Sequence, residues 1–176
     1  MHPACSILTY SNPDSTIKLY TDSDFDNCED THRSQSGVAI LMFGAALLWK
    51  SVRQPVVALS STEAEYMAQC LGAQEALYIL YFLDSLDIQD LHPQDPIVLR
   101  GDNEGAIKML MEGSDNTRTK HIDRKFYFLR ELVHDGLFIP SHINSQLNFA
   151  DGLTKGLTKQ LQKTSMARLL GLHHQE

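Results

Sequence analysis

Cysteine is scarce in this 176-residue chain. The three cysteines, Cys5, Cys28 and Cys70, are an odd number, and their spacing matches neither a disulfide framework nor a CxxC metal site. Cysteine usage of this kind is typical of a reducing compartment, so an intracellular, cytoplasmic location is expected. The sequence assigns no function to these cysteines.

Long apolar runs are also missing. The longest, residues 38–49, is shorter than the about 20 residues that a membrane-spanning helix needs, and Gly44 interrupts it. The first residues lack the basic and apolar stretches of a secretory signal. We therefore expect no membrane segment and no secretory leader, and we interpret residues 1–16 as the tail of a connection to an upstream segment.

The chain has no excess of positive charge, and its formal net charge is −7. Proteins that bind nucleic acid usually carry a basic face, so this charge argues at first against such a partner. The charges are segregated, however: acidic residues gather between 22 and 30, and five basic residues lie between 118 and 130. A solvated helix face is the commoner meaning of such a basic run. Charge alone does not decide between the two.

Hydrophobic residues make up 43% of the chain, which indicates one globular domain with a full core. Residues 17–22 alternate as a strand does, and the apolar run 38–49 breaks at 43–45, which predicts two strands joined by a tight turn. A short buried strand is predicted over 97–99 and ends at Asp102. The last strand, 137–142, contains Pro140, which suggests a sheet edge.

Helices are predicted between and after these strands. They begin after Ser60 and after Asp102, and others cover 119–136, 144–156 and 161–172. Strands first, and then alternating strands and helices, predict an α/β fold with a five-stranded mixed sheet, three antiparallel strands followed by two parallel ones, flanked by helices.

Two glutamates near the first predicted helix have different expected roles. Ser60 followed three residues later by Glu63 fits a capping box, in which the two side chains satisfy free backbone N–H groups at a helix start. Glu63 therefore has a structural role. Glu65 has none, and it lies in the first turns of the helix, where it is a candidate for chemistry.

Four carboxylates lie where this fold could bring them together: Asp22 near the end of the first strand, Glu65, Asp102 after the fourth strand, and Asp151 in a late helix. Such a group would repel itself unless cations occupy it. Two divalent ions balance four carboxylates in formal charge, and oxygen ligands favour Mg²⁺ or Mn²⁺ over zinc. Spacing alone does not select these four from the 22 acidic residues.

The motifs around these residues do select them. Six motifs in unbroken order, across about residues 7–172, resemble the ribonuclease H domain of copia-type retrotransposon polyproteins. They are "YTDSDF", "RSQSGVAI", "WKSVRQPVVALSSTEAEYMA", "GDNEGAI", "RTKHIDRKFYFLRE" and "FADGLTK". The resemblance implies a ribonuclease H-like fold over residues 17–158, a C-terminal helix and tail over 159–176, and a reverse transcriptase domain upstream of residues 1–16.

The resemblance also implies an activity and a set of site residues. Asp22, Glu65, Asp102 and Asp151 match the catalytic carboxylates, which would hold two Mg²⁺ ions, with Mn²⁺ as a substitute. The implied reaction is endonucleolytic, in-line hydrolysis of the RNA strand of an RNA–DNA hybrid, leaving a 5′-phosphate and a 3′-hydroxyl. The implied setting is the cytoplasmic virus-like particle of a retrotransposon.

Further residues match the family's motifs, each with a plainer alternative. His142 matches a catalytic histidine, but a histidine at a strand end is often a solvated surface residue. Contacts to the hybrid are implied for eight residues, which can also be explained as a helix cap or as surface charge and polarity: Asn103, Ser36, Ser61, Gln54, Arg118, Lys120, His121 and Arg124. Asp24 is expected to make a strand-end hydrogen bond rather than a metal contact, and Trp49 is expected to anchor the core.

Two other functions remain open on the sequence. One is a 3′–5′ exonuclease of the same fold superfamily, which would also use clustered carboxylates. The other is a non-catalytic domain that serves the folding or assembly of the polyprotein. Exonuclease action would shorten a substrate from its end, and a non-catalytic domain would show no metal-dependent turnover.

Overall fold

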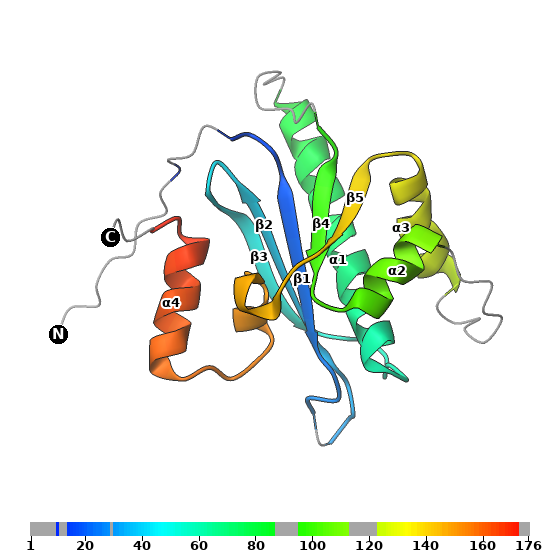
Figure 1. Ribbon diagram of the computed structural model, residues 1–176, viewed down its shortest axis with the longest axis vertical. Helices are drawn as coiled ribbons and strands as arrows, with labels where there is room; N and C mark the ends of the chain where they lie inside the picture. Colours follow the sequence, from blue (N-terminus) through cyan, green and yellow to red (C-terminus); the bar gives the residue numbers. More distant parts are fainter. Residues whose placement is uncertain (1–9, 11–13, 29, 87–94, 113–122, 173–176) are drawn as a thin grey trace.

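The structure is a computed structural model that describes residues 10, 14–28, 30–86, 95–112 and 123–172, with only the backbone described at 112 and 123–126. Figure 1 shows a single sheet with helices on both of its faces. The elements in chain order are β1 (Lys18–Asp24), β2 (Gln35–Met42), β3 (Ala45–Arg53), α1 (Ser61–Ser85), β4 (Ile97–Gly101), α2 (Glu104–Glu112), α3 (Asp123–His134), β5 (Phe138–His142), the 3₁₀ turns η2 (Ser145–Leu147) and η3 (Asp151–Leu153), and α4 (Lys159–Leu169).

The sheet has the strand order β3-β2-β1-β4-β5. Strands β1, β2 and β3 pair antiparallel, and β1–β4 and β4–β5 pair parallel, so the predicted mixed sheet is confirmed. Phe43 and Gly44 join β2 to β3 with φ angles of 55° and 84°. This is the left-handed backbone that two-residue hairpins need. Pro140 lies in β5, an edge strand, as its missing N–H predicts.

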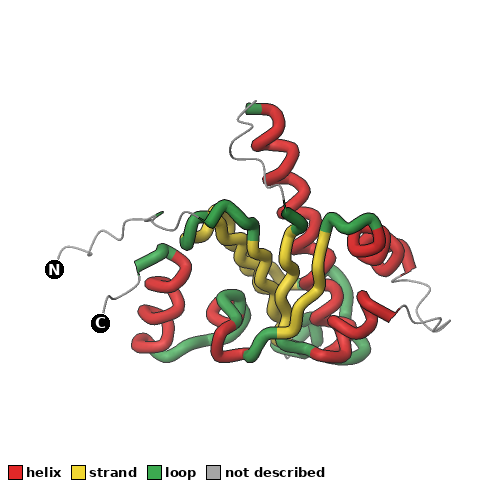
Figure 2. Tube along the Cα trace, turned by 45° about the horizontal axis from the view of Figure 1, so that its top comes forward, coloured by secondary structure: helices red, strands yellow, loops and turns green. Residues whose placement is uncertain are grey.

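One face of the sheet carries the main core. Buried residues of four strands, among them Leu19 and Val38, pack against α1, α2 and α3. Helix α1 lies very close to β1, because a Cβ atom on Gly72 would be only 2.8 Å from Cγ2 of Thr21. Figure 2 shows the C-terminal part of α1 extending beyond the sheet. None of the described helices is long and apolar enough to cross a bilayer.

The opposite face is covered by the C-terminal part of the chain. Tyr20, Ala39 and Leu41 pack there against Ala150 of the η2–η3 region and Leu169 of α4. Because side chains alternate along a strand, Asp22 shares this face with Tyr20. The first strand therefore presents Leu19 to the main core and Asp22 to the segment around η3.

The expected cap of α1 is present. The Ser60 hydroxyl accepts a hydrogen bond from the Glu63 N–H at 3.1 Å, and the Glu63 carboxylate accepts one from the Leu59 N–H at 2.9 Å. The carboxylate thus reaches one residue further back than in the usual capping box. The Glu63 carboxylate is therefore used in the cap of α1. Glu65 lies two residues further along the helix, and these two bonds do not involve it.

Two structural expectations were wrong. Residues 144–156 do not form one helix but the two short turns η2 and η3. The reason is local, because Asn144 and Asn148 accept hydrogen bonds from the N–H groups of Gln146 and Ala150, an alternative to helical bonding. Trp49 is not a core anchor. It is 48% exposed, since it lies on the edge strand β3, in which every second residue from Leu47 to Arg53 is exposed.

Candidate active site

Three carboxylates from separate elements meet at one end of the sheet. Asp22 is near the end of β1, Glu65 is in the first turns of α1, and Asp102 directly follows β4. Strands β1 and β4 are parallel neighbours, so their carboxyl ends lie at the same edge. One oxygen from each residue lies within 4.8 Å of the others. We call Asp22, Glu65 and Asp102 the three-carboxylate cluster.

The two carboxylate oxygens of Glu65 have different surroundings. Its side chain is only 5% exposed, and its Oε1 accepts a hydrogen bond from the Ser23 N–H at 3.1 Å. Its Oε2 is buried and has no hydrogen-bond partner among the residues that the structure describes. Burial, together with the charges of Asp22 and Asp102, raises the pKa of Glu65 to about 9. A buried carboxylate oxygen without a donor is costly unless a cation meets it.

Asp22 is the most deeply buried member, at 2% exposure. Burial raises its pKa to about 6, against the effects of a hydrogen bond from Thr154 and the charge of Lys155, which lower it. The Thr154 hydroxyl donates to Oδ2 of Asp22. Asp102 and Asp151 add negative charge nearby, which raises the pKa further. Asp22 therefore interacts electrostatically with each of the other three proposed ligands.

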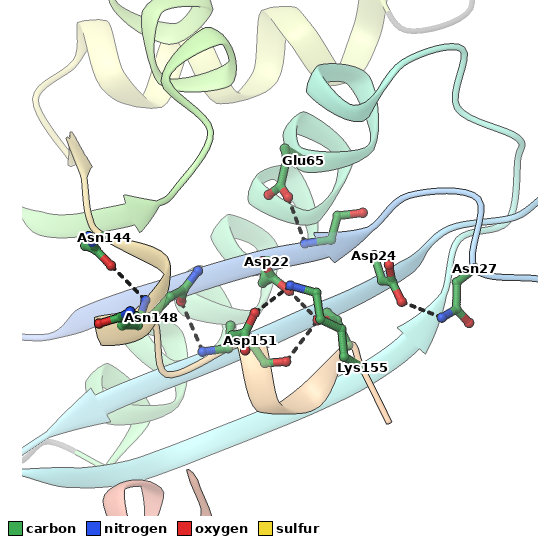
Figure 3. Close-up of polar contacts among 12 residues, drawn as sticks. Asp22, Asp24, Asn27, Glu65, Asn144, Asn148, Asp151 and Lys155 are labelled. Carbon is green, nitrogen blue, oxygen red and sulfur yellow. Dashed lines mark hydrogen bonds and ion pairs between the residues drawn. The ribbon is translucent and has the colours of Figure 1, made fainter. Parts of the chain in front are cut away.

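Asp151, the fourth proposed ligand, stands in η3 and is paired with a lysine. Its Oδ1 lies 2.6 Å from Nζ of Lys155, and the two side chains are 31% and 45% exposed. Figure 3 shows this pair beside Asp22, with Glu65 on the far side of β1. Asp151 is not among the residues whose oxygens lie within 4.8 Å of one another.

A buried asparagine fixes the segment that carries Asp151. Asn148 donates from Nδ2 to the backbone carbonyl of Thr21 at 2.9 Å, and its Oδ1 accepts from the Ala150 N–H at 3.1 Å. It therefore ties residues 148–154 to β1 beside Asp22. Sequence reasoning did not identify Asn148, because this contact joins residues 127 positions apart.

His142 and Asn103 both lie next to Asp102. His142 is exposed at the end of β5, and its Nε2 is 3.2 Å from the backbone oxygen of Asp102. Asn103 caps α2, because its Oδ1 accepts from the Ala106 N–H at 2.9 Å. The helix-cap explanation for Asn103 is therefore present in the structure. The catalytic role of His142 and the substrate contact of Asn103 stay predictions.

The remaining substrate-contact candidates have different surroundings. Ser36 and Gln54 are 2% and 3% exposed, and Gln54 Nε2 donates to Ser36 Oγ at 2.9 Å. Their side chains thus lie beneath the surface, whereas Ser61 is exposed at the start of α1. The basic candidates give no test: Arg118, Lys120 and His121 lie outside the described residues, and Arg124 lies in α3 with no described side chain.

The donor set suits a hard divalent cation. The three-carboxylate cluster offers only oxygen atoms, and one of them, Glu65 Oε2, is buried with no donor from the described part of the chain. Mg²⁺ and Mn²⁺ prefer such ligands. Asp24 is not part of the cluster, and its carboxylate accepts a hydrogen bond from Asn27 at the strand end, as expected.

No family model matches the chain, but curated proteins do. It is 33% identical, over 94% of its length, to the retrovirus-related Pol polyprotein from transposon TNT 1-94 of Nicotiana tabacum. It is 31% identical, over 82% of its length, to the corresponding polyprotein from transposon RE2 of Arabidopsis thaliana. The chain spans 12% and 10% of these relatives. The predicted resemblance to retrotransposon polyproteins is confirmed.

Solved structures share the fold. The N-terminal RNase H domain of rv2228c from Mycobacterium tuberculosis superimposes with a TM-score of 0.57 at 10% identity, covering 90% of this chain and 99% of that one. LC11-RNase H1, isolated from compost by a metagenomic approach and solved in complex with an RNA/DNA hybrid, gives 0.52 at 20% identity, covering 78% and 93%. By sequence the chain belongs with the retrovirus-related Pol polyproteins of transposons, and by fold it is a ribonuclease H-like domain.

Proposed function

We propose that this domain is a ribonuclease H, a metal-dependent endonuclease that hydrolyses the RNA strand of RNA–DNA hybrids during retrotransposon reverse transcription. The observation that carries the proposal is the three-carboxylate cluster, in which Glu65 Oε2 is buried and meets no hydrogen-bond donor of the described ranges. The ribonuclease H-like fold and the transposon relatives support it. The hybrid bound by LC11-RNase H1, a protein of the same fold, favours the same substrate here.

The proposed cofactor is a pair of Mg²⁺ ions, with Mn²⁺ as a substitute. When bound, such ions supply activation of water and stabilisation of the departing oxygen in an in-line displacement. The residues that would hold them are Asp22, Glu65, Asp102 and Asp151. In-line attack would leave a 5′-phosphate and a 3′-hydroxyl.

Other residues of the chain would orient this chemistry. The Ser23 N–H and the Thr154 hydroxyl hold Glu65 and Asp22 in fixed orientations. Fixed ligands require little reorganisation during the reaction. His142, exposed beside the Asp102 backbone, is proposed to act near the attacking water or the departing product. We further propose that the domain works behind a reverse transcriptase, in the cytoplasmic virus-like particle of the element.

Cleavage of a labelled RNA–DNA hybrid tests the proposal. The wild-type domain and Asp102→Asn would be compared in Mg²⁺, Mn²⁺ and EDTA, with single-stranded RNA and both homoduplexes as substrate controls. We expect hybrid-selective cutting that needs a divalent ion and is lost in Asp102→Asn. Equal activity of the variant would falsify the assignment.

The form of the substrate separates the two alternatives. A circular or end-blocked hybrid is cut by an endonuclease but not by a 3′–5′ exonuclease. Absence of turnover on every substrate, in protein shown to bind Mg²⁺, would favour the non-catalytic assembly domain.

A further inference from the structure

Within the part of the chain that the structure describes, Lys155 places an ammonium group against one of the proposed ligands. Its Nζ lies 2.6 Å from Oδ1 of Asp151, four residues earlier. Thr154, between them, donates its hydroxyl to Asp22. The two consecutive residues 154 and 155 therefore contact two different proposed ligands, Asp22 and Asp151. Figure 3 shows Lys155 beside Asp151 and Asp22.

The positive charge of Lys155 affects the pKa values of other residues in the site. Burial alone would lower the pKa of Lys155, but the hydrogen bond to Asp151 and the charges of Asp22 and Asp102 raise it overall. In return, Lys155 lowers the pKa values of Asp22 and Glu65. The ammonium group of Lys155 thus offsets part of the negative charge of the proposed ligands.

A divalent cation and Lys155 need the same carboxylate. Asp22, Glu65 and Asp102 already have oxygens within 4.8 Å of one another, but Asp151 is not in that set and is bonded to the ammonium instead. We propose that Lys155 is a positioning residue that holds Asp151 in the metal-free domain and competes with the divalent cation for it. This inference rests on the proposed function.

Two consequences follow from such competition. The three-carboxylate cluster is ready to hold a first cation, whereas recruitment of Asp151 requires the Lys155–Asp151 pair to open. Metal binding is therefore weaker than four free carboxylates would give. In the absence of metal, the positive charge of Lys155 in turn reduces the mutual repulsion of the carboxylates. Lysine suits this role because its flexible four-carbon stem lets the ammonium move away.

Metal titration of the whole domain tests this proposal without an activity assay. Binding of MgCl₂ and MnCl₂ would be measured by calorimetry and by the rise in thermal unfolding temperature relative to EDTA. The variants are Lys155→Met, Lys155→Arg and Lys159→Met. Lys159 begins α4 and is exposed, so its replacement removes an equal charge from a neighbouring lysine.

We expect Lys155→Met to bind metal about twofold to fivefold more tightly than wild type, the range that a partly exposed ion pair represents. Lys155→Arg should stay near the wild-type affinity because it keeps the charge. Lys159→Met should change the affinity less than Lys155→Met. In an Asp151→Asn background the gain from Lys155→Met should shrink, because the competed ligand is no longer present.

The outcomes are distinguishable. Absence of metal binding by the wild-type domain would overturn the proposed function itself. Wild-type binding with unchanged or weaker binding by Lys155→Met would overturn only the role of Lys155, as would an equal gain in the Asp151→Asn background. If Lys155→Met does not fold in EDTA, Lys155→Gln, which keeps a polar end group, replaces it in the same comparison.

Discussion

Gly37 of β2 and Thr154, which follows η3, lie so close together that a Cβ atom on Gly37 would be 2.8 Å from Cγ2 of Thr154. The same Cβ atom would lie 2.8 Å from the backbone oxygen of Ala150. Gly37 is the direct partner of Asp22 in the β1–β2 ladder. The missing side chain lets residues 148–154 lie against the sheet at the point where Asp22 needs them.

Replacement of Gly37 by alanine should therefore damage the site. We expect Gly37→Ala to lower the free energy of unfolding by about 1–3 kcal/mol through overpacking. A displacement of Thr154 and Asp151 by even 1 Å would lower hybrid cleavage by about tenfold to hundredfold. Gly156→Ala is the matched control, since a Cβ atom there meets nothing within 4 Å. Cleavage rates and urea unfolding of the two variants make the comparison.

Glu63 and Glu65 should respond in opposite ways to substitution. Glu63→Ala removes the bond to the Leu59 N–H and should cost about 1 kcal/mol of stability with little loss of activity. Glu65→Gln removes a buried carboxylate whose Oε2 has no hydrogen-bond partner among the described residues, and should abolish cleavage without lowering the stability of the metal-free domain. Parallel chemical unfolding and hybrid cleavage would show this; a stable, active Glu65→Gln variant would contradict the site.

The stability of the metal-free domain should fall as the pH rises. The native pKa values of Asp22, about 6, and Glu65, about 9, lie above those of ordinary carboxyl groups. Between the ordinary pKa of a carboxyl group and the native pKa of each of these residues, the folded state therefore binds more protons than the unfolded state. The contribution is complete below the ordinary carboxyl pKa and is lost as the pH passes the native values.

Thermal unfolding in EDTA would measure this effect. The unfolding temperature should be higher at about pH 5 than at about pH 8.5, by about 2–4 °C for each kcal/mol of proton linkage. Glu65→Gln should flatten the dependence most, and saturating Mg²⁺ should also reduce it, because cations stabilise the ionised carboxylates. A profile in EDTA that rises toward alkaline pH would contradict the assigned burial of these groups.

Replacement of the buried Asn148 should lower both stability and cleavage. Asn148→Ala leaves the Thr21 carbonyl and the Ala150 N–H without their partner, which should cost about 1–3 kcal/mol. Because Asn148 also positions the segment that holds Asp151, cleavage should fall as well. Asn144→Ala, at an exposed asparagine whose side chain accepts a local hydrogen bond from the Gln146 N–H, is the control for both measurements.

The sheet could be predicted because each strand depends on a local signal, and these signals also placed Asp22, Glu65 and Asp102 within the fold. Their choice as proposed ligands, among 22 acidic residues, came from the family motifs around them. Alternation marked β1, and the Ser60–Glu63 cap left Glu65 without a structural role. A short apolar run followed by Asp102 predicted the end of β4. These patterns span only a few residues, and so periodicity and capping reveal them.

The surroundings of Asp151 could not be predicted in the same way. The ties of Asn148 to Thr21 and of Thr154 to Asp22 join residues 127 and 132 positions apart. No periodic pattern in either segment specifies its partner. The false helix over 144–156 has the same origin, since asparagine side chains there bond to nearby N–H groups instead of continuing a helix.

The separation of Asp22 from Thr154 also has a consequence for biosynthesis. A ribosome that adds about 5–20 residues per second needs roughly 7–26 seconds to pass from the codon of one to that of the other. During that interval the emerging polypeptide contains the first strand but not the segment that fixes its aspartate. A nascent chain therefore cannot bring the four carboxylates together until the ribosome has translated the segment that contains Asp151 and Thr154.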